Sequence, residues 1–386
     1  MLLMLGYLAF LYGDLNGQPI YEKDSIKLVI DKVIKYQNSN PWTTEKDYDW
    51  IRGTYYTGIM ACYQATGDKK FLDQCVKWGE DYNWGVPSGQ PADDPFYIAG
   101  PNLLTCTQTW MECYLDKKQD KRIKPTIEHL DKKNIKNPVN YPLQWCYSQG
   151  VKYVDALYVA GPSLAMLYKI TGKQKYANWL DSFFWDVCGT LFDEKTNLFY
   201  RDIHYMPAYP PGNTSDQAAR KSVFYQRTAA GKKVMWSRGN GWAFAALVRI
   251  LKYLPKEEGN WDKYKALFIK MAESLRERQN EDGFWRPNLD DPLDFPYKET
   301  SGTSFFSYGI AWGVNNGILE RAKFLPVLTK AWDALNSAVS SEGKVQWGQL
   351  EAGSPYIVKQ EDSHEYVSGA FLLAASEMYK LNLLKK

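Results

Sequence analysis

The sequence predicts an all-α fold, an (α/α)6 barrel of six helical hairpins. Three observations lead to this prediction: 3.6-residue hydrophobic periodicity indicates about twelve helices, strand patterns are few, and one hairpin phrase recurs. The phrase is clearest in ACYQATGDKKFLDQCVKWGEDY from Ala61 and in MLYKITGKQKYANWLDSFFWDV from Met166. Each copy joins an apolar helix end through a Thr-Gly turn to a second, amphipathic helix. Weaker copies extend the series to six helix ends, which favours a closed ring over an open solenoid.

The expected helices alternate in character along the chain. The even-numbered ones are apolar and rich in small residues, as in GTYYTGIMACY, whereas the odd-numbered ones carry Lys and Glu, as in WDKYKALFIKMAESLRER. We therefore expect an inner ring of even-numbered helices and an outer ring of odd-numbered ones. The segments NLFYRDIHY and GKVQWGQL are expected to be short and extended. The expected helices are residues 26–38, 51–66, 69–83, 103–115, 119–132, 154–171, 174–188, 240–254, 261–279, 304–319, 325–339 and 366–381.

We expect one barrel domain over residues 21–386, because no linker or low-complexity stretch divides the chain. Residues 1–20 differ from it. They begin MLLMLGYLAFLYGDLNG, which is apolar like a signal peptide but lacks a basic n-region and a clear cleavage site. This segment is either a signal remnant or an apolar first segment, and it is too short to span a membrane. It slightly favours a periplasmic or secreted protein over a cytoplasmic one.

Composition narrows the class of ligand. Basic and acidic residues nearly balance (47 against 44), and no basic stripe is present, which argues against nucleic acid as a partner. The chain has 15 Trp and 28 Tyr, an excess that suggests platforms for flat sugar rings. Its six cysteines show no CxxC pair and are expected to be mostly buried free thiols. With three His in the chain, we expect no His-based metal site.

The loops that enter the inner helices are expected to meet at one mouth of the barrel. These loops, including YDWIRG, VKYVD and MWSRGNGW, carry aromatic and charged residues, a combination that indicates a carbohydrate ligand. Asp155 stands out among them, because a carboxylate between Val154 and Ala156 is costly to bury unless it is paired or used. Asp is also a favoured helix N-cap. From the spacing alone, both interpretations of Asp155 remain open.

Five motifs carry a family resemblance, in this order: VDALYVAGPSLAMLYKITG, WSRGNGWAF, DGFWRPNLDDP, KETSGTSFFSYGIAWGVNNGIL and GAFLLAASEMYKL. With them, the chain resembles the unsaturated glycuronyl hydrolases of glycoside hydrolase family 105, which are related to family 88. The match extends from DWIRGTYYTGIM to the C-terminal helix. The resemblance implies an (α/α)6 barrel that removes a 4,5-unsaturated uronic acid from the non-reducing end of oligosaccharides made by polysaccharide lyases. It implies no cofactor.

The resemblance also implies roles for individual residues. Asp155 matches the family's proton donor, which protonates C4 of the unsaturated ring before water adds at C5. Trp236, Arg238 and Trp242 match a trio that lines the pocket, with Arg238 facing the uronate carboxylate and the tryptophans stacking on sugar rings. An alternative for the trio is tight packing at a Gly-containing helix start.

Three further positions are implied with more variation. Trp50 falls where the family has an aromatic sugar contact, although it would also suit the core. Arg201 and Gln144 fall where some members carry histidines, so they would tune the sugar subsite or be ordinary surface residues.

One departure from the family bears on activity. Asn102 occupies the position of a second catalytic Asp, and an amide cannot act as a base. Asn102 would position water by hydrogen bonding, or Asp93 or Asp94 would reach the site instead, or the activity would be lost or changed. We favour a hydrolase that is active but altered. The alternatives are a same-barrel hydrolase or lyase that acts on saturated glycosides, and a non-catalytic carbohydrate-binding protein.

Overall fold

The computed structural model describes residues 14–15, 18–42, 49–87, 104–132, 152–206 and 226–381. Several residues of interest lie outside this described part of the chain: Asp93, Asp94, Asn102, Gln144 and most of the N-terminal segment.

Every expected helix has a counterpart among the twelve α-helices of the described residues, and most ends agree within four residues. The expected helix over 119–132 is divided into the 3-10 turn η2 (Asp120–Arg122) and α6. The helices are α1 (Lys23–Ser39), α2 (Trp50–Thr66), α3 (Lys69–Asp81), α5 (Thr105–Asp116), α6 (Lys124–Lys132), α8 (Ala156–Thr171), α9 (Gln174–Leu191), α11 (Ser237–Tyr253), α12 (Trp261–Glu277), α13 (Thr300–Asn315), α14 (Arg321–Ser337) and α15 (Glu365–Leu381).

Extended structure is limited to short pieces. Strands β1 (Asp14–Leu15) and β2 (Gln18–Pro19) form one antiparallel pair, and β3 (Phe192–Asp193) and β4 (Leu198–Phe199) form another. The first segment predicted to be extended contains β4 and the bridge of Asp202 to Tyr153, and the second contains the bridge of Val345 to Val339, in agreement with the sequence analysis. A second 3-10 turn, η3 (Ile203–Tyr205), follows β4.

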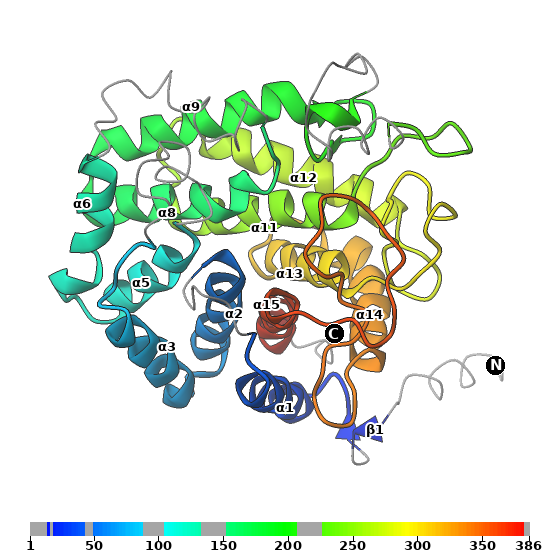
Figure 1. Ribbon diagram of the computed structural model, residues 1–386, viewed down its shortest axis with the longest axis horizontal. Helices are drawn as coiled ribbons and strands as arrows, with labels where there is room; N and C mark the ends of the chain where they lie inside the picture. The colour runs from blue at the N-terminus through cyan, green and yellow to red at the C-terminus, as the bar shows by residue number, and fades with distance from the viewer. Residues whose placement is uncertain are drawn as a thin grey trace.

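Every second helix of the twelve, counted along the chain, belongs to the predicted closed inner ring. Helices α2, α5, α8, α11, α13 and α15 each pack against the next, and α15 packs against α2 to complete the circle. Figure 1 shows α1, α3, α6, α9, α12 and α14 around them. The outer helices bury one face: in α12 the buried side chains of Tyr264, Phe268, Met271 and Leu275 recur at helical spacing. The inner helices are buried on nearly all sides, as their composition predicted.

The seam between α2 and α15 depends on two glycines. A Cβ at Gly58 would meet the carbonyl oxygen of Gly369 at 2.5 Å, and a Cβ at Gly369 would meet the carbonyl oxygen of Thr54 at 2.4 Å. Only glycine permits this approach of the two backbones. The first and last inner helices can therefore close the ring.

Pro162 lies inside α8, where it removes the hydrogen bond that would reach the carbonyl of Tyr158. The side chain of Gln108 on α5 donates to this carbonyl instead, at 2.8 Å. The interruption of α8 is therefore compensated by the neighbouring inner helix, and α8 continues to Thr171.

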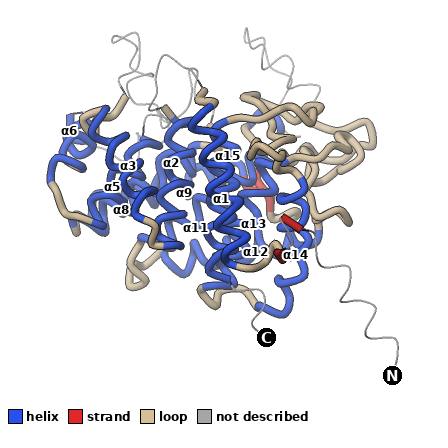
Figure 2. Tube along the Cα trace, turned by 90° about the horizontal axis from the view of Figure 1, so that it is seen from below, coloured by secondary structure: helices blue, strands red, loops and turns tan. Residues whose placement is uncertain are grey.

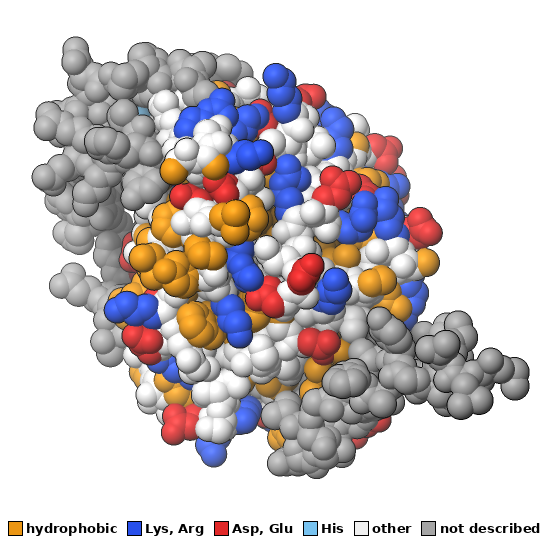
Figure 3. Space-filling view, turned by 90° about the vertical axis from the view of Figure 1, so that its right-hand side faces the viewer, with side chains coloured by type: hydrophobic (Ala, Val, Ile, Leu, Met, Phe, Trp, Pro, Cys, Tyr) orange, Lys and Arg blue, Asp and Glu red, His pale blue; other side chains and the backbone are white. Residues whose placement is uncertain are grey.

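The two ends of the barrel differ. At one end, the predicted Thr-Gly turns are tight: Gly67 and Gly172 adopt φ values of 74° and 65° and end α2 and α8. At the other end, which is the mouth, long loops follow α12 and α14 (Figure 2). Figure 3 shows apolar side chains gathered between charged ones on the side of the molecule where these loops lie, and both loops contain exposed apolar residues, Leu293 and Ile357 among them.

Two further expectations concern the described residues. Cys62, Cys75, Cys106 and Cys113 are buried free thiols and Cys188 is a half-buried one, as predicted. No helix in the described ranges is both long and apolar enough to cross a membrane.

Candidate functional site

Asp155 directly precedes α8 at the mouth, but its side chain does not cap the helix. It makes no hydrogen bond to the amides of the first turn, whereas Asp49 caps α2 by accepting from the amide of Ile51 at 2.9 Å. About a quarter of the Asp155 side chain is exposed (26%). The capping interpretation left open by the sequence is therefore wrong for Asp155, and its carboxylate is available to a ligand.

An arginine held in place by a buried carboxylate lies beside Asp155. Nε of Arg201 is 3.9 Å from Oδ2 of Asp155, and Nη1 of Arg201 donates to Oδ2 of Asp202 at 2.6 Å. Asp202 also accepts from the backbone amide of His204 at 2.8 Å. A backbone bridge joins Asp202 to Tyr153, whose ring centroid is 4.0 Å from the Arg201 guanidinium. This bridge brings two segments distant in sequence to one site.

The two carboxylates beside Arg201 have opposite electrostatic character. Burial raises the pKa of Asp155, and the nearby charges of Arg201 and Arg238 only partly oppose this rise. Burial also opposes ionisation of Asp202, but hydrogen bonds from His204 and Arg201 hold its pKa below the usual range. Asp155 is thus suited to carry a proton, and Asp202 is a fixed anion that orients Arg201.

Aromatic side chains form the floor of the mouth. The ring centroid of Trp242 lies 4.5 Å from that of Phe305, 5.0 Å from that of Tyr158, 5.6 Å from that of Tyr366 and 6.1 Å from that of Trp50. Trp242 is buried and Trp50 is half-buried. Trp50, the predicted aromatic sugar contact, therefore presents more of its ring to a ligand than Trp242, one of the two tryptophans predicted to stack.

Arg238 and Trp236 hold a mouth loop. Nη1 of Arg238 donates to the carbonyl of Leu350 at 2.6 Å, and Nη2 donates to that of Ala352 at 2.8 Å. Nε1 of Trp236 donates to the side chain of Gln349 at 2.9 Å, and the guanidinium of Arg238 lies 4.3 Å from the Trp236 ring centroid. Both predicted binding residues are buried. In this structure the polar contact of Trp236 is directed at the loop, and those of Arg238 are directed at the loop and at the hydroxyl of Tyr366 on α15.

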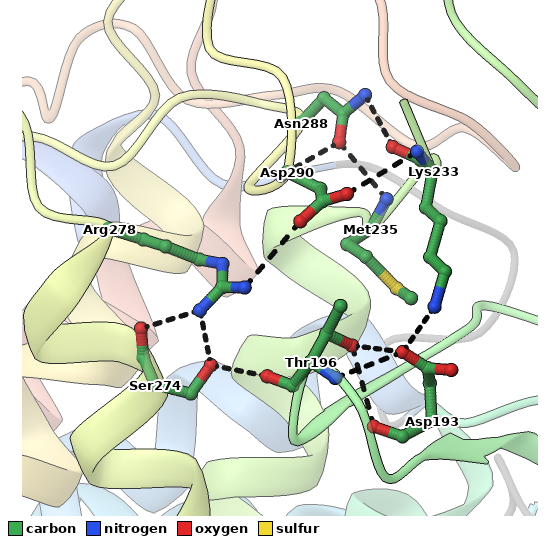
Figure 4. Close-up of polar contacts among 8 residues, drawn as sticks. All are labelled: Asp193, Thr196, Lys233, Met235, Ser274, Arg278, Asn288 and Asp290. Atoms are coloured by element: carbon green, nitrogen blue, oxygen red, sulfur yellow. Dashed lines mark hydrogen bonds and ion pairs between the residues drawn. The ribbon is translucent and has the colours of Figure 1, made fainter. Parts of the chain in front are cut away.

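A polar network fixes the segment that leads into α11 (Figure 4). Lys233 pairs with Asp193 at 2.7 Å, and Asn288 accepts from the amide of Met235 at 3.0 Å. Asp290, next along the same loop, pairs with Arg278 at 3.5 Å. The start of α11 is therefore tied to β3 and to the loop that follows α12.

Several polar mouth residues were not found by the sequence analysis. Glu299 is buried and caps α13, and burial raises its pKa, as it does that of Asp49. A signal for both was present, because an acid directly precedes an inner helix in each case. Asp202 and His364 offered no comparable signal. Among the described residues, no group of three or more His, Cys, Asp or Glu is placed to hold a metal ion.

Comparisons with known proteins agree with this architecture. Residues 25–382 match the model of glycosyl hydrolase family 88. The unsaturated 3S-rhamnoglycuronyl hydrolase of Alteromonas sp. (strain LOR) is 33% identical over 346 residues, which are 85% of this chain and 77% of that protein.

Solved structures agree as well. A glycosyl hydrolase family 88 protein from Bacteroides vulgatus superposes with a TM-score of 0.80 at 28% identity, over 93% of this chain and 99% of its own. A polysaccharide lyase superposes with a TM-score of 0.79, also at 28% identity, over 92% of this chain and 97% of its own. The family match covers nearly the whole barrel, with its inner and outer rings of helices. This chain belongs to glycosyl hydrolase family 88 and is a glycoside hydrolase, the class of enzyme that the sequence predicted.

Proposed function

We propose that this enzyme removes a 4,5-unsaturated uronic acid from the non-reducing end of oligosaccharides that polysaccharide lyases release. The family match supports this proposal, and so does the name of the Alteromonas relative, an unsaturated 3S-rhamnoglycuronyl hydrolase. The substrate ring contains a C4=C5 double bond conjugated with the carboxylate and joined to the ring oxygen. It is therefore a vinyl ether that a single acid can activate.

Asp155 is the general acid in this proposal. Its carboxyl proton moves to C4, the double-bond electrons form the new C–H bond, and positive charge develops at C5 and the ring oxygen. Water adds to C5 and loses a proton, which gives a hemiketal. The hemiketal ring opens to a ketone at C5 and a hemiacetal at C1, and this hemiacetal collapses to an aldehyde and releases the neighbouring sugar with a hydroxyl group. No bond at C1 is attacked directly, so the paired carboxylates of an ordinary glycosidase are not required.

The observation that carries the proposal is the state of the Asp155 carboxyl group. It is uncommitted to helix capping, partly exposed at the mouth, and has a pKa raised by burial. A general acid needs its proton near the working pH, and a raised pKa favours this. An acid that caps a helix, such as Asp49, is not free in this way, because its carboxylate already accepts from backbone amides.

We expect Arg201 to contribute more than Arg238 to binding of the uronate carboxylate. Arg201 is 22% exposed and lies beside Asp155, whereas Nη1 and Nη2 of Arg238 both donate to loop carbonyls. The carboxylate is attached to C5, next to the carbon that receives the proton. A guanidinium beside Asp155 is therefore well placed for it.

The family resemblance does not identify the group that directs the water, because Asn102 stands in place of the second catalytic Asp. We propose that Asp49 contributes, because it caps the start of α2, the inner helix that packs against α5. Replacement of Asn102 by Asp should then raise the rate of hydration, and replacement of Asp49 by Asn should lower it. If neither change alters the rate, neither position directs the water.

The direct test follows the ultraviolet absorbance of the conjugated double bond while the enzyme acts on lyase-generated oligosaccharides. We expect the absorbance to fall as the double bond is hydrated and the uronic acid ring opens. A second candidate, polysaccharide lyase activity, is favoured by the similarity to a solved lyase and by Asn102. A lyase would instead raise the absorbance on saturated uronate-containing polysaccharides, and this result would replace the proposed hydrolysis.

A further inference from the structure

His364 is a buried histidine whose ring is unpartnered. His364 is 3% exposed, and in the described part of the chain neither Nδ1 nor Nε2 of its ring has a hydrogen-bond partner. A buried polar group without a partner reduces stability, so native proteins rarely retain one. Replacement by an apolar ring would remove this cost. The imidazole is therefore a candidate for a ligand contact.

The surroundings of His364 place it at the edge of the mouth. The residue directly precedes α15, and its carbonyl accepts from the amide of Val367 at 3.0 Å. Its ring centroid lies 4.4 Å from that of Trp42, which is 43% exposed, and 5.1 Å from that of Tyr366. Tyr366 belongs to the aromatic floor, 5.5 Å from Trp50. His364 and Trp42 thus continue this floor outward, on the side formed by α2 and α15.

The imidazole of His364 is itself suited to a neutral ligand. Arg52 is engaged by Glu365 at 2.8 Å and by the carbonyl of Trp42 at 2.8 Å. Burial, and then the positive charge of Arg238, lower the pKa of His364 to about 4. The ring is therefore neutral near pH 7, with one N–H donor and one acceptor nitrogen. Such a ring suits sugar hydroxyls better than a sulfate or a carboxylate.

We propose that His364 and Trp42 bind the neutral sugar that follows the unsaturated uronic acid. Trp42 offers the face for the ring, and His364 exchanges hydrogen bonds with its hydroxyls. The assignment of this sugar to the leaving side rests on the proposed function, because an enzyme that acts at the non-reducing end has further sugar only on that side. The site itself rests on the unpartnered ring and the exposed indole.

The test measures binding without turnover, by calorimetry on the full chain carrying Asp155→Asn. Two probes are compared: the disaccharide of unsaturated glucuronic acid and rhamnose, and the methyl glycoside of unsaturated glucuronic acid. In this background, His364→Phe should raise the Kd of the disaccharide about tenfold and change that of the methyl glycoside less than about twofold, as expected for one lost hydrogen bond. The melting temperature of His364→Phe should be unchanged or higher. His129→Phe, on the outer helix α6, is the matched control and should change neither Kd.

Three results would overturn the inference: equal weakening of both probes, no weakening of either, or no measurable binding of the disaccharide to the parent. A clear fall in the melting temperature of His364→Phe would also overturn it, because the ring would then be structural. Failure of the proposed function is seen separately, as an unchanged double-bond absorbance with the wild-type enzyme.

Discussion

A carboxylate and an arginine meet at each end of the barrel, and the two pairs differ in every respect that matters for chemistry. At the closed end, Glu112 in the last turn of α5 and Arg249 in the last turn of α11 are 3.0 Å apart, with both side chains 1% exposed. At the mouth, Asp155 and Arg201 are 3.9 Å apart and 26% and 22% exposed. The first pair is sealed in the core, and the second is open to a ligand.

The number of partners separates the two carboxylates. Burial disfavours the charge of both. Arg249, Lys252 and Tyr253 overcome this effect for Glu112 and hold its pKa below the usual range. The partners of Asp155 do not overcome burial, so its pKa is raised. A fully partnered carboxylate stabilises a fold, whereas an incompletely partnered one retains a proton that it can donate.

The largest expected effect is on catalysis. Asp155→Asn keeps the shape of the side chain but removes the transferable proton, so the hydration rate should fall about a hundred- to ten-thousandfold. The loss of double-bond absorbance measures this rate, and the melting temperature should be nearly unchanged because Asp155 caps nothing. A fully active Asp155→Asn variant would show that Asp155 is not the proton donor.

At the closed end, the expected effect is on stability and not on catalysis. Arg249→Met leaves Glu112 as a buried charge without its main partner, and the free energy of unfolding should fall by about 3–5 kcal/mol. Denaturant unfolding measures this loss. The double variant Glu112→Leu, Arg249→Met should recover most of it, because the charge is then gone from both sides. A single variant as stable as the wild type would mean that the pair contributes little.

Sequence reasoning reached the ring and Asp155, because both depend on local pattern. Helical periodicity and Thr-Gly turns are local, and so is an acid at the start of an apolar helix. It placed the start of α11 at residue 240 rather than at Ser237, so it left Gly239 outside the helix. The structure shows why glycine is present: a Cβ at Gly239 would meet Val154 at 3.1 Å, and a Cβ at Gly241 would meet Phe305 at 3.0 Å.

Contacts between distant segments were beyond that reasoning. The donation from Arg238 to the carbonyl of Leu350 spans 112 positions, and the ion pair of Arg201 with Asp155 depends on a backbone bridge between Tyr153 and Asp202. The register of a single bridge leaves no periodic trace in a sequence. Asp155, Arg201 and Arg238 were therefore singled out from the sequence, but their partners were not.

The pH dependence of catalysis sharpens the role of Arg201. A general acid works in its protonated form, so kcat/KM should fall as the pH rises through the pKa of Asp155. Arg201 favours the ionised form and lowers that pKa. Arg201→Met should therefore move the alkaline limb of the profile to higher pH, while Arg201→Lys, which keeps the charge, should leave it nearer to the wild type. A limb that stays in place or moves to lower pH would contradict the pairing.

The smallest expected effect is on stability. It comes from comparing two acids, one at each end of the barrel, that each lie directly before a helix. Asp68, beside the closed-end turn, caps α3 by accepting from the amide of Lys70 at 3.2 Å, and it also pairs with Lys27 at 3.0 Å. Asp68→Ala should lower the free energy of unfolding by about 1 kcal/mol and leave hydration unchanged. Asp155→Ala should do the reverse, because it removes an acid whose ionisation burial disfavours and which caps nothing. Urea unfolding measures both, and Asp68→Asn serves as the control because an amide still caps. Equal losses of stability at Asp68 and Asp155 would show that the mouth acid has a structural role, and the contrast between the two ends would then fail.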